Sequence, residues 1–314
     1  MSPATGPTSG HEMDIKELGY IVLDTFSLAA WGSYLREVVG AMVSEAGPGT
    51  LRVRIDERDC LLLLREAAAD KLAAVGWLLR DESDYEAAFA RARGAGLLVT
   101  EGALQECTAR RVNGFFAITD PAGHRHELAW GPVVNLREHF VSRIGVPSFV
   151  TGVDGLGHLV ITCSLSQYDA TCRFLTEALG LGLANFRRQS LASDKGVKFP
   201  IAWFHTGNGR QHSLGLAASM PEGVAGHGCR HINLEVPDID DVGRALDRAD
   251  AHAVRIARSL GRHVNDRAIS FYMASPGGCL IEYGCSAPRR DWSQEVAYDD
   301  GGAGSVWGHR VARA

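Results

Sequence analysis

The sequence lacks the features that define membrane and nucleic-acid proteins. No apolar run approaches the length of a membrane span, and the N-terminal region has neither a basic nor an apolar signal segment. Positive charge is not in excess, since 32 basic side chains face 37 acidic ones for a net charge of -5. Nucleic acid attracts basic patches, so we expect neither nucleic acid nor a membrane as partner. A small molecule is the expected partner.

The sequence also lacks a cysteine pattern that would indicate a disulfide framework. Its seven cysteines form no C-x-x-C pair, and an odd number cannot all be paired with one another. Such a chain is typical of a reducing compartment, so we expect a cytoplasmic protein. Residues 1–14 are rich in Pro, Gly, Ser and Thr and are expected to form a flexible tail. The 314 residues exceed what one small core usually organises, which predicts two domains.

The pattern of expected strands and helices occurs twice along the chain. In the first half a strand at 16–23 precedes a helix at 28–39 and two strands at 51–55 and 60–64, and a similar series follows. The pattern restarts with a strand at 158–163. We therefore predict an α+β fold of four repeated β-α-β-β modules in two domains, each an open barrel of mixed strands flanked by helices.

An irregular stretch between the halves places the expected domain connection. Pro and Gly interrupt any clean period from 132 to 155. The prediction is an N-terminal domain at 15–140, a linker at 141–154, a C-terminal domain at 155–290 and a C-terminal extension at 291–314.

Short motifs shared by the halves indicate an internal duplication and also show where the halves differ. Tyr20 stands where the second half has His158, and we align Val75 with His231, although each half keeps a Glu at the same place after its turn. Only the second half therefore retains a full set of metal-ligand types. The motifs that carry the alignment are Leu18-Gly-Tyr20 with Leu156-Gly-His158 and Asp120-Pro-Ala-Gly123 with Ser275-Pro-Gly-Gly278.

Glu282 lies on the returning strand of an expected hairpin and has apolar neighbours on both sides. Alternation places Leu280, Glu282 and Gly284 on one face of this strand and Ile281 and Tyr283 on the other. A carboxylate enclosed in this way needs a partner, because an unpaired buried charge is costly. An Arg or Lys is one possible partner, and a metal ion is the other.

His158 and His231 begin equivalent strands of two successive modules, and Glu282 lies on the last strand of the second module. Two His and one carboxylate form the facial triad that covers one side of an octahedral ferrous ion. Alternation predicts that Val160 points the same way as His158, and Asn233 the same way as His231. Both pairs are expected to face a shared concavity. A lone His at a strand start is more often a hydrogen-bonded structural residue, so the repetition is what favours a metal site.

The second half contains five motifs that are specific only when taken together: Gly155-Leu-Gly-His158, Arg230-His-Ile-Asn-Leu-Glu-Val236, Leu260-Gly-Arg-His-Val-Asn-Asp266, Ser270-Phe-Tyr272 and Ile281-Glu-Tyr-Gly284. Together they resemble the type I extradiol catechol dioxygenases, the 2,3-dihydroxybiphenyl 1,2-dioxygenase group of the vicinal oxygen chelate superfamily. This resemblance extends over roughly residues 16–310. It implies the glyoxalase/bleomycin-resistance/dioxygenase fold, with a non-catalytic N-terminal domain and a catalytic C-terminal domain that binds an Fe(II) cofactor. The substrates that it implies are O2 and a 2,3-dihydroxybiphenyl-like or other 3-substituted catechol, in bacterial aromatic degradation. We also expect a homo-oligomer.

Position by position, the resemblance assigns roles to residues of this chain. It implies that His158, His231 and Glu282 bind Fe(II), and that His212 is the acid-base histidine. A metal-bound catechol has a lowered phenolic pKa, so a nearby imidazole can accept its proton. His263 and Tyr272 fall where the family hydrogen-bonds the substrate oxygens. The expected substrate-binding residues are Phe204, Asn265, Asp266, Arg230 and Val160.

Arg230 is a departure from the family pattern, because close relatives have a second His before the ligand histidine. This departure leaves the substrate open and the metal site intact. The segment 185–198, with Arg187, Arg188 and Lys195, is expected to be a solvated loop near the pocket mouth. The alternative hypothesis is that its cations or Arg230 attract a substrate carboxylate.

The same fold hosts other functions, which gives three alternatives. An isomerase or lyase of the glyoxalase type would use a redox-inert metal and usually more carboxylate ligands. A 4-hydroxyphenylpyruvate dioxygenase uses the same ligand types, but the motifs at 261–266 and 270–272 look unlike it. A metal-free small-molecule-binding protein would not need the complete ligand set, so bound iron discriminates it from an enzyme.

Overall fold

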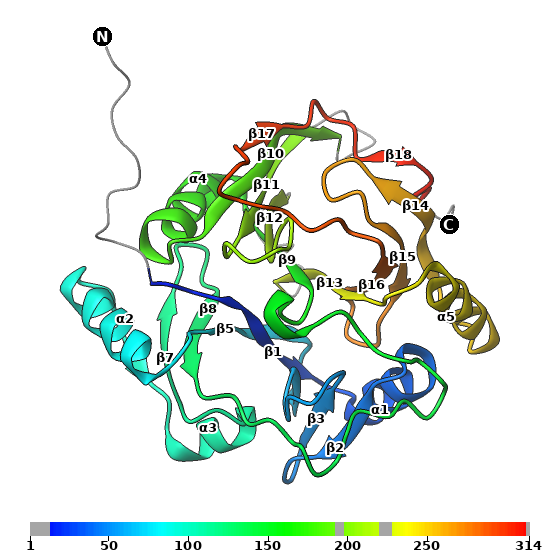
Figure 1. Ribbon diagram of the computed structural model, residues 1–314, viewed down its shortest axis with the longest axis horizontal. Coiled ribbons are helices and arrows are strands. Elements are labelled where there is room, and N and C mark those ends of the chain that lie inside the picture. The colour runs from blue at the N-terminus through cyan, green and yellow to red at the C-terminus, as the bar shows by residue number, and fades with distance from the viewer. Residues whose placement is uncertain (1–12, 192–197, 220–227, 312–314) are drawn as a thin grey trace.

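Two mixed β-sheets, one from each half of the chain, form the framework of the computed structural model (Figure 1). The structure describes residues 13–191, 198–219 and 228–311. The order of the first sheet is β2-β3-β4-β1-β5-β8-β7-β6, and that of the second is β17-β10-β11-β12-β9-β13-β16-β15-β14-β18. The inner eight strands of the second sheet follow the same order as the strands of the first, with each strand number higher by eight. The internal duplication is thus visible in the topology.

The first half contains eight strands and four helical segments within the described residues. The strands are β1 (Glu17–Thr25), β2 (Met42–Glu45), β3 (Thr50–Arg54), β4 (Leu62–Glu66), β5 (Lys71–Leu78), β6 (Thr100–Glu101), β7 (Gly114–Thr119) and β8 (Arg125–Trp130). The helical segments are α1 (Leu28–Tyr34), the π-helical turn η1 (Leu35–Val39), α2 (Glu82–Gly94) and α3 (Leu104–Arg110).

The second half repeats this series and adds two short strands at its end. Its helical segments are η2 (Gly152–Asp154), α4 (Leu165–Arg173), the π-helical turn η3 (Phe174–Ala178) and α5 (Ile239–Ala251). Its strands are β9 (His158–Ser164), β10 (Gly182–Leu191), β11 (Lys198–His205), β12 (Leu214–Ser219), β13 (Cys229–Glu235), β14 (Ile256–His263), β15 (Ile269–Ala274), β16 (Leu280–Cys285), β17 (Tyr298–Asp299) and β18 (Ser305–Trp307).

The predicted α+β architecture of four modules in two β-sheet domains is confirmed, with one more strand in each module than the sequence indicated. The additional strands are β2, β6, β10 and β14. The segment 185–198 had been expected to be a loop, but residues 185–191 belong to β10, whereas 192–197 lie outside the described residues. An outer strand rich in Arg lacks the apolar alternation on which a strand prediction depends. No helix among the described residues is long and apolar enough to span a membrane.

Side-chain alternation on the central strands separates the core from the functional face. In β13, Ile232 and Leu234 lie in the hydrophobic core, as do Ile281 and Tyr283 of β16. His231 and Glu282 therefore point to the opposite side of the sheet, as the period of two predicted. The core continues into the first half without interruption, and Met13, within the predicted tail, is buried in it.

Hydrogen bonds between the halves supplement this shared core. The backbone amide of Leu156 donates to the carbonyl of Leu18 at 2.9 Å, just before the strand that carries His158. Arg248 of α5 donates to the carbonyl of Val38 at 3.0 Å. In the C-terminal region, β17 pairs with β10 and β18 pairs with β14, so both edges of the second sheet come from the predicted extension (Figure 1).

Candidate metal centre and active site

Three neighbouring strands of the second sheet bring His158, His231 and Glu282 together. β13 is the middle strand, and its Asn233 lies opposite His158 on β9 and opposite Glu282 on β16. His231 is two residues from Asn233 and so shares its face of the sheet. The three predicted ligands are distant in sequence, but they thus lie within two residues of the same register position on adjacent strands.

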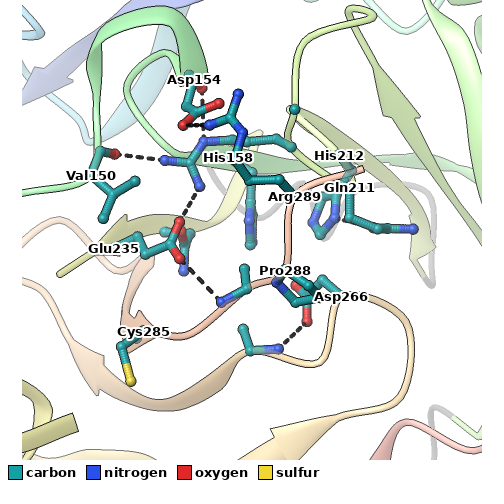
Figure 2. A pocket seen from close by; sticks show the side chains of 16 residues that line it. Val150, Asp154, His158, Gln211, His212, Glu235, Asp266, Cys285, Pro288 and Arg289 are labelled. Carbon is teal, nitrogen blue, oxygen red and sulfur yellow. Dashed lines mark hydrogen bonds and ion pairs between the residues drawn. The ribbon is translucent and has the colours of Figure 1, made fainter. Parts of the chain in front are cut away.

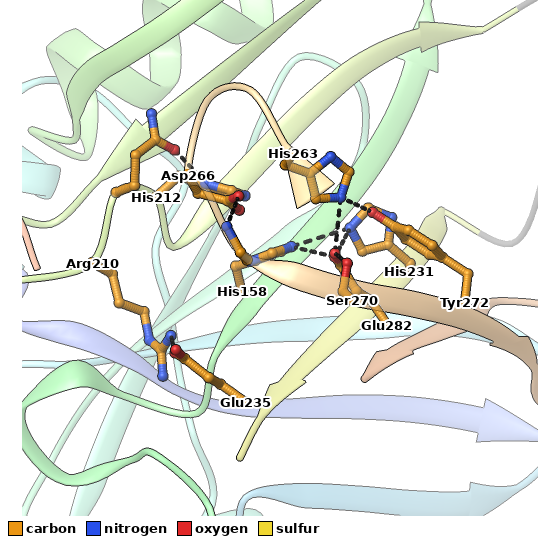
Figure 3. A network of polar contacts seen from close by, with 12 residues as sticks. His158, Arg210, His212, His231, Glu235, His263, Asp266, Ser270, Tyr272 and Glu282 are labelled. Carbon is orange, nitrogen blue, oxygen red and sulfur yellow. Dashed lines mark hydrogen bonds and ion pairs between the residues drawn. The ribbon is translucent and has the colours of Figure 1, made fainter. Parts of the chain in front are cut away.

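The three side chains converge on one point (Figure 3). The Nε2 atoms of His158 and His231 lie 3.2 Å apart, and Oε2 of Glu282 lies 3.0 Å from the first and 3.2 Å from the second. Adjacent ligands of an octahedral divalent ion with bonds of about 2.1–2.2 Å are separated by about 3 Å. The donor types and their spacing therefore fit one face of a hexacoordinate ion.

A glycine conformation allows the first ligand to reach this position. Gly157 has φ of 141°, and a Cβ atom there would lie 2.2 Å from the backbone oxygen of Asn233. A residue with a side chain would push β9 away from β13 at the point where His158 begins. Gly157 therefore fixes the separation of two ligand-bearing strands.

The cluster is almost closed to solvent. Glu282 is 1% exposed, His158 6% and His231 9%. Burial alone would raise the pKa of Glu282, but the contacts with His158, His231 and His263 hold it well below its usual value. Burial lowers the pKa of His231 to about 4, which keeps its imidazole neutral and available as a ligand.

Ser270 and His309 had no assigned role in the sequence analysis, and they support the other carboxylate oxygen, the first directly and the second through Ser270. Ser270 Oγ donates to Oε1 of Glu282 at 2.6 Å. His309, from the C-terminal region, contacts Ser270 through Nε2 and stacks on His263 with ring centroids 4.0 Å apart. These contacts orient a ligand carboxylate from outside the cluster. A serine at an alternate strand position gave no signal for this role in the sequence.

His263 and Tyr272 meet on the side of the cluster opposite His212 (Figure 3). His263 Nε2 lies 2.8 Å from the Tyr272 hydroxyl and 3.1 Å from Oε1 of Glu282. Although burial opposes protonation, the contact with Glu282 raises the pKa of His263 to about 9. Burial and the charge of Glu282 raise the pKa of Tyr272 well above its usual value, so its phenol remains a hydrogen-bond donor.

His212 lies against the first ligand, with its ring centroid 4.0 Å from that of His158. Its Nδ1 is 2.6 Å from Oε1 of Gln211, so the imidazole donates through Nδ1. Nε2 is buried and has no hydrogen-bond partner within the described residues. Burial and the neighbouring His158 lower the pKa of His212 well below its usual value, which leaves Nε2 with a free lone pair.

A second group of possible ligands, formed by His158, His212 and Asp266, shares one histidine with the first. Its members have competing contacts, since Gln211 engages His212 and the Ala268 amide donates to Asp266. The first group instead presents three atoms at the spacing of adjacent ligands. His158, His231 and Glu282 are therefore the better candidate metal site.

A cavity of about 350 Å³ opens beside the ligand cluster. Trp203 lines it, whereas Phe204, which the sequence analysis assigned to it, is 1% exposed in the core. The alternation of β11 places only one of two adjacent aromatic residues on each face, and the prediction selected the wrong one. The other expected members of the wall lie where the sequence placed them, namely Val160, Arg230, Asn265 and Asp266.

The cations of the segment 185–198, which had been expected to be a loop, differ in their surroundings. Arg187 lines the cavity, with its Nε and one terminal nitrogen 2.7 Å from the two carboxylate oxygens of Asp300. Arg188 is exposed, and Lys195 lies outside the described residues. Arg230 lines the cavity with a solvent-exposed side chain, and the protein around it together with the charge of Arg258 lowers its pKa.

A smaller cavity of about 100 Å³ lies on the other side of His158 and His212 (Figure 2). Ion pairs close its walls: Arg210 contacts Glu235 at 2.5 Å, and Arg289 contacts Asp154. The main cavity is therefore the one with room for an aromatic ring.

The first half has no comparable centre among the residues described. The register places Tyr20 at the position of His158 and Ala74 at that of His231. The sequence alignment had used Val75, one residue away, because small apolar neighbours cannot fix a register by themselves. At the position of Glu282, Glu127 binds Arg110 through contacts of 2.5 and 2.8 Å. The two kinds of partner considered for a buried carboxylate are thus divided between the halves. Glu127 pairs with an Arg, and Glu282 belongs to the candidate metal cluster.

The paired module topology and the cluster of His158, His231 and Glu282 are typical of a metal-dependent enzyme class, and comparisons with known proteins agree. The sequence profile of the Glyoxalase/Bleomycin resistance protein/Dioxygenase superfamily matches residues 155–283.

A biphenyl-2,3-diol 1,2-dioxygenase of Metapseudomonas furukawaii is 33% identical over 96% of this chain and 95% of its own length. An iron-dependent extradiol dioxygenase of Rhodococcus jostii is 33% identical over 95% of this chain and 97% of its own. The crystal structure of a halotolerant catechol dioxygenase superposes with a TM-score of 0.86 at 31% identity, covering 96% of each chain. The chain belongs to the extradiol dioxygenase family of this superfamily.

Proposed function

We propose that this protein is an Fe(II)-dependent extradiol dioxygenase that opens a catechol ring with O2 in bacterial aromatic degradation. One observation carries the proposal: two imidazoles and one carboxylate with the spacing of a facial triad face a cavity large enough for an aromatic ring. Two His and one carboxylate with open positions are the ligands of ferrous oxygenases. His158, His231 and Glu282 would hold the iron.

Bound iron supplies the chemistry that protein side chains lack, because it holds the catechol and O2 together and lets electrons pass between them. Both oxygen atoms enter the product, and the ring carbons supply the electrons, so no further reductant is needed. His212 is the proposed acid-base residue, since its Nε2 is buried, unpartnered and next to the ligand cluster. It takes the proton of one catechol hydroxyl and returns it when the ring opens.

His263 and Tyr272 are the proposed partners of the substrate oxygens. Support comes from their contacts with each other and with Glu282 at the metal cluster. A protonated imidazole and a neutral phenol can both donate hydrogen bonds to a developing oxyanion. We assign Val160, Arg230, Asn265 and Asp266, all in the wall of the main cavity, to substrate binding.

The proposed substrate is a biphenyl-2,3-diol-like or other 3-substituted catechol. Relatives that support this class include the Metapseudomonas furukawaii enzyme and a 3-methylcatechol 2,3-dioxygenase of Pseudomonas putida, which is 33% identical over 95% of this chain. A cytoplasmic location fits the seven free cysteines. Assembly into a homo-oligomer is proposed from the exposed Val306 and Trp307 on edge strand β18 and is tested by light scattering.

Anaerobic loading with Fe(II), followed by a catechol in air, tests the function. The expected result is one bound iron per chain, O2 consumption and a yellow ring-opened product, all lost in His158→Ala. Bound metal without O2 consumption would favour an isomerase or lyase of the glyoxalase type. A protein that binds no metal would favour the small-molecule-binding alternative.

A further inference from the structure

Three arginines line the main cavity, and only one of them is neutralised by the protein. Arg187 is held by Asp300, with contacts of 2.7 Å to both carboxylate oxygens. Arg230 and Arg258 have no ion pair or side-chain hydrogen bond with any residue in the described part of the chain. The cavity wall therefore presents two guanidinium groups without a protein anion.

The two free guanidinium groups lie near the ligand cluster and near each other. Arg258 lies across from Tyr272 on the paired strand, with Cζ 5.4 Å from the centre of the Tyr272 ring. The other side of this ring meets His231, with centroids 5.2 Å apart, and Arg230 is the residue that precedes His231. The two like charges are close enough to disfavour one another. Both arginines thus stand beside the region that a ring held at the metal would occupy.

The acidic side chains of the cavity wall are already engaged elsewhere. Of the two that line it, Glu282 belongs to the metal cluster and accepts from Ser270. Asp266 lies near His158 and His212, and it accepts from the amide of Ala268. Neither forms an ion pair with Arg230 or Arg258. Arg230 is exposed and Arg258 partly exposed, so both can be reached by a ligand, and an anion that meets both guanidinium groups would form charge-assisted hydrogen bonds with them.

We propose that the substrate is a catechol that bears a carboxylate, on the ring or on a short side chain, and that Arg230 and Arg258 bind this carboxylate. The inference rests on the ring-cleavage function proposed above and narrows its substrate class. The metal end of the cavity holds the two hydroxyl groups, so the carboxylate lies farther out, where the two cations are. Planar guanidinium groups match the two oxygens of a carboxylate, and the rest of a cavity of about 350 Å³ accommodates the ring.

The test compares an acid with a neutral analogue of the same shape. Iron-loaded protein is given 3-(2,3-dihydroxyphenyl)propanoate or the corresponding propanamide, and likewise 2,3-dihydroxybenzoate or its amide. The expected kcat/KM is about tenfold to a hundredfold higher for the acid of at least one pair. Dissociation constants measured without O2 should show the same preference.

Variants identify the groups that cause the preference. In Arg230→Gln and Arg258→Gln the ratio of acid to amide should fall toward one, with iron content measured to show that the folded site persists. Arg188→Gln is the matched control, since its side chain is 80% exposed and the residue is not part of the cavity wall. This control should keep the ratio of the unaltered protein.

The outcomes separate this inference from the function on which it rests. Equal kcat/KM values for acid and amide in both pairs would overturn the carboxylate inference and leave ring cleavage standing. A preference for the acid that survives both arginine variants would overturn the assigned residues. If no catechol is cleaved, the ring-cleavage function fails, and the anaerobic dissociation constants still decide the inference: tighter binding of the acid supports it, and equal binding contradicts it.

Discussion

Glu127 and Glu282 occupy equivalent positions in the two sheets, and each is nearly inaccessible to solvent, with exposures of 0% and 1%. Glu127 is neutralised by the guanidinium of Arg110, whereas Glu282 faces the imidazoles of His158 and His231. The duplicated module pairs thus differ: one holds an internal salt bridge and the other a candidate metal site. The first half is filled by side chains: a Cβ on Gly76 would lie 2.4 Å from the ring of Tyr20.

Arg110→Met tests the structural role of the buried pair. The change leaves Glu127 with only Tyr20 and the partly exposed Arg125 as partners. We expect the free energy of unfolding to fall by roughly 3 kcal/mol, because removing one partner of a buried ion pair is costly even though Arg125 remains. Denaturant unfolding measures the loss, and iron content should stay unchanged. Arg80→Met, which removes an exposed pair with Asp84, is the control, and an equal loss there would contradict the account.

Ser270→Ala tests the support of the ligand carboxylate. The change removes the hydrogen bond to Oε1 of Glu282 and a contact of His309. Loss of such an orienting contact typically weakens metal binding by about 10- to 100-fold, which is the expected rise in the Fe(II) dissociation constant. Competition with a chelator under anaerobic conditions measures it. Unchanged affinity would show that the cluster is held by its own strands alone.

The contact between Gln211 and His212 predicts a difference between two variants. His212→Asn removes the acid-base group and should lower kcat by about 100- to 10,000-fold while iron stays bound. Gln211→Leu keeps the imidazole but removes the acceptor that fixes its Nδ1 proton, so kcat should fall by about tenfold to a hundredfold. Anaerobic substrate affinity should change little in Gln211→Leu. A loss that appears in affinity instead of kcat would contradict a positioning role.

His205 makes the stability of the metal-free protein depend on pH. Burial lowers its pKa from 6.5 to about 4, and its Nδ1 accepts a hydrogen bond from the Gly207 amide at 3.0 Å. Between these pH values the unfolded chain binds more protons than the folded one, so stability falls as the pH falls. After allowance for partial exposure, the loss from about pH 7 to about pH 4.5 is roughly 1–2 kcal/mol.

His205→Phe provides the comparison for this prediction. It keeps an aromatic ring against Trp292, on which His205 stacks with centroids 3.8 Å apart, and has no proton to gain. Denaturant unfolding of both metal-free proteins at the two pH values isolates the effect. The variant should lose less stability on acidification than the unaltered protein, and equal losses would exclude His205 as the cause.

The convergence of the three predicted ligands could be anticipated from the sequence, because it depends on repetition and alternation. His158 and His231 begin equivalent strands, and the period of two fixes which side Glu282 faces, so no knowledge of loops was required. The assignment of Phe204 came from the family resemblance and does not match the cavity wall, because Phe204 lies in the core and the adjacent Trp203 lines the cavity. Alternation missed β10, because a charged outer strand has no apolar alternation.

Other members of the site could not be recognised from local sequence. Ser270 contributes one hydrogen bond, to Glu282 on the neighbouring strand. His309 contacts Ser270 from the C-terminal region, just after β18. Arg258 faces the cavity because of bulges in the pairing of β14 with β15. Contacts of this kind depend on tertiary register, which composition and periodicity do not determine. The functional bounds of the two domains stay a prediction.

The product of the reaction tests the central claim most directly. Iron-loaded protein is incubated with 3-methylcatechol and isotopically labelled O2, and the product is analysed by mass spectrometry and NMR as it forms. We expect a ring broken beside the pair of hydroxyl-bearing carbons, with both atoms of one O2 molecule incorporated. A ring broken between those two carbons, or release of hydrogen peroxide from an intact ring, would contradict extradiol cleavage by this site.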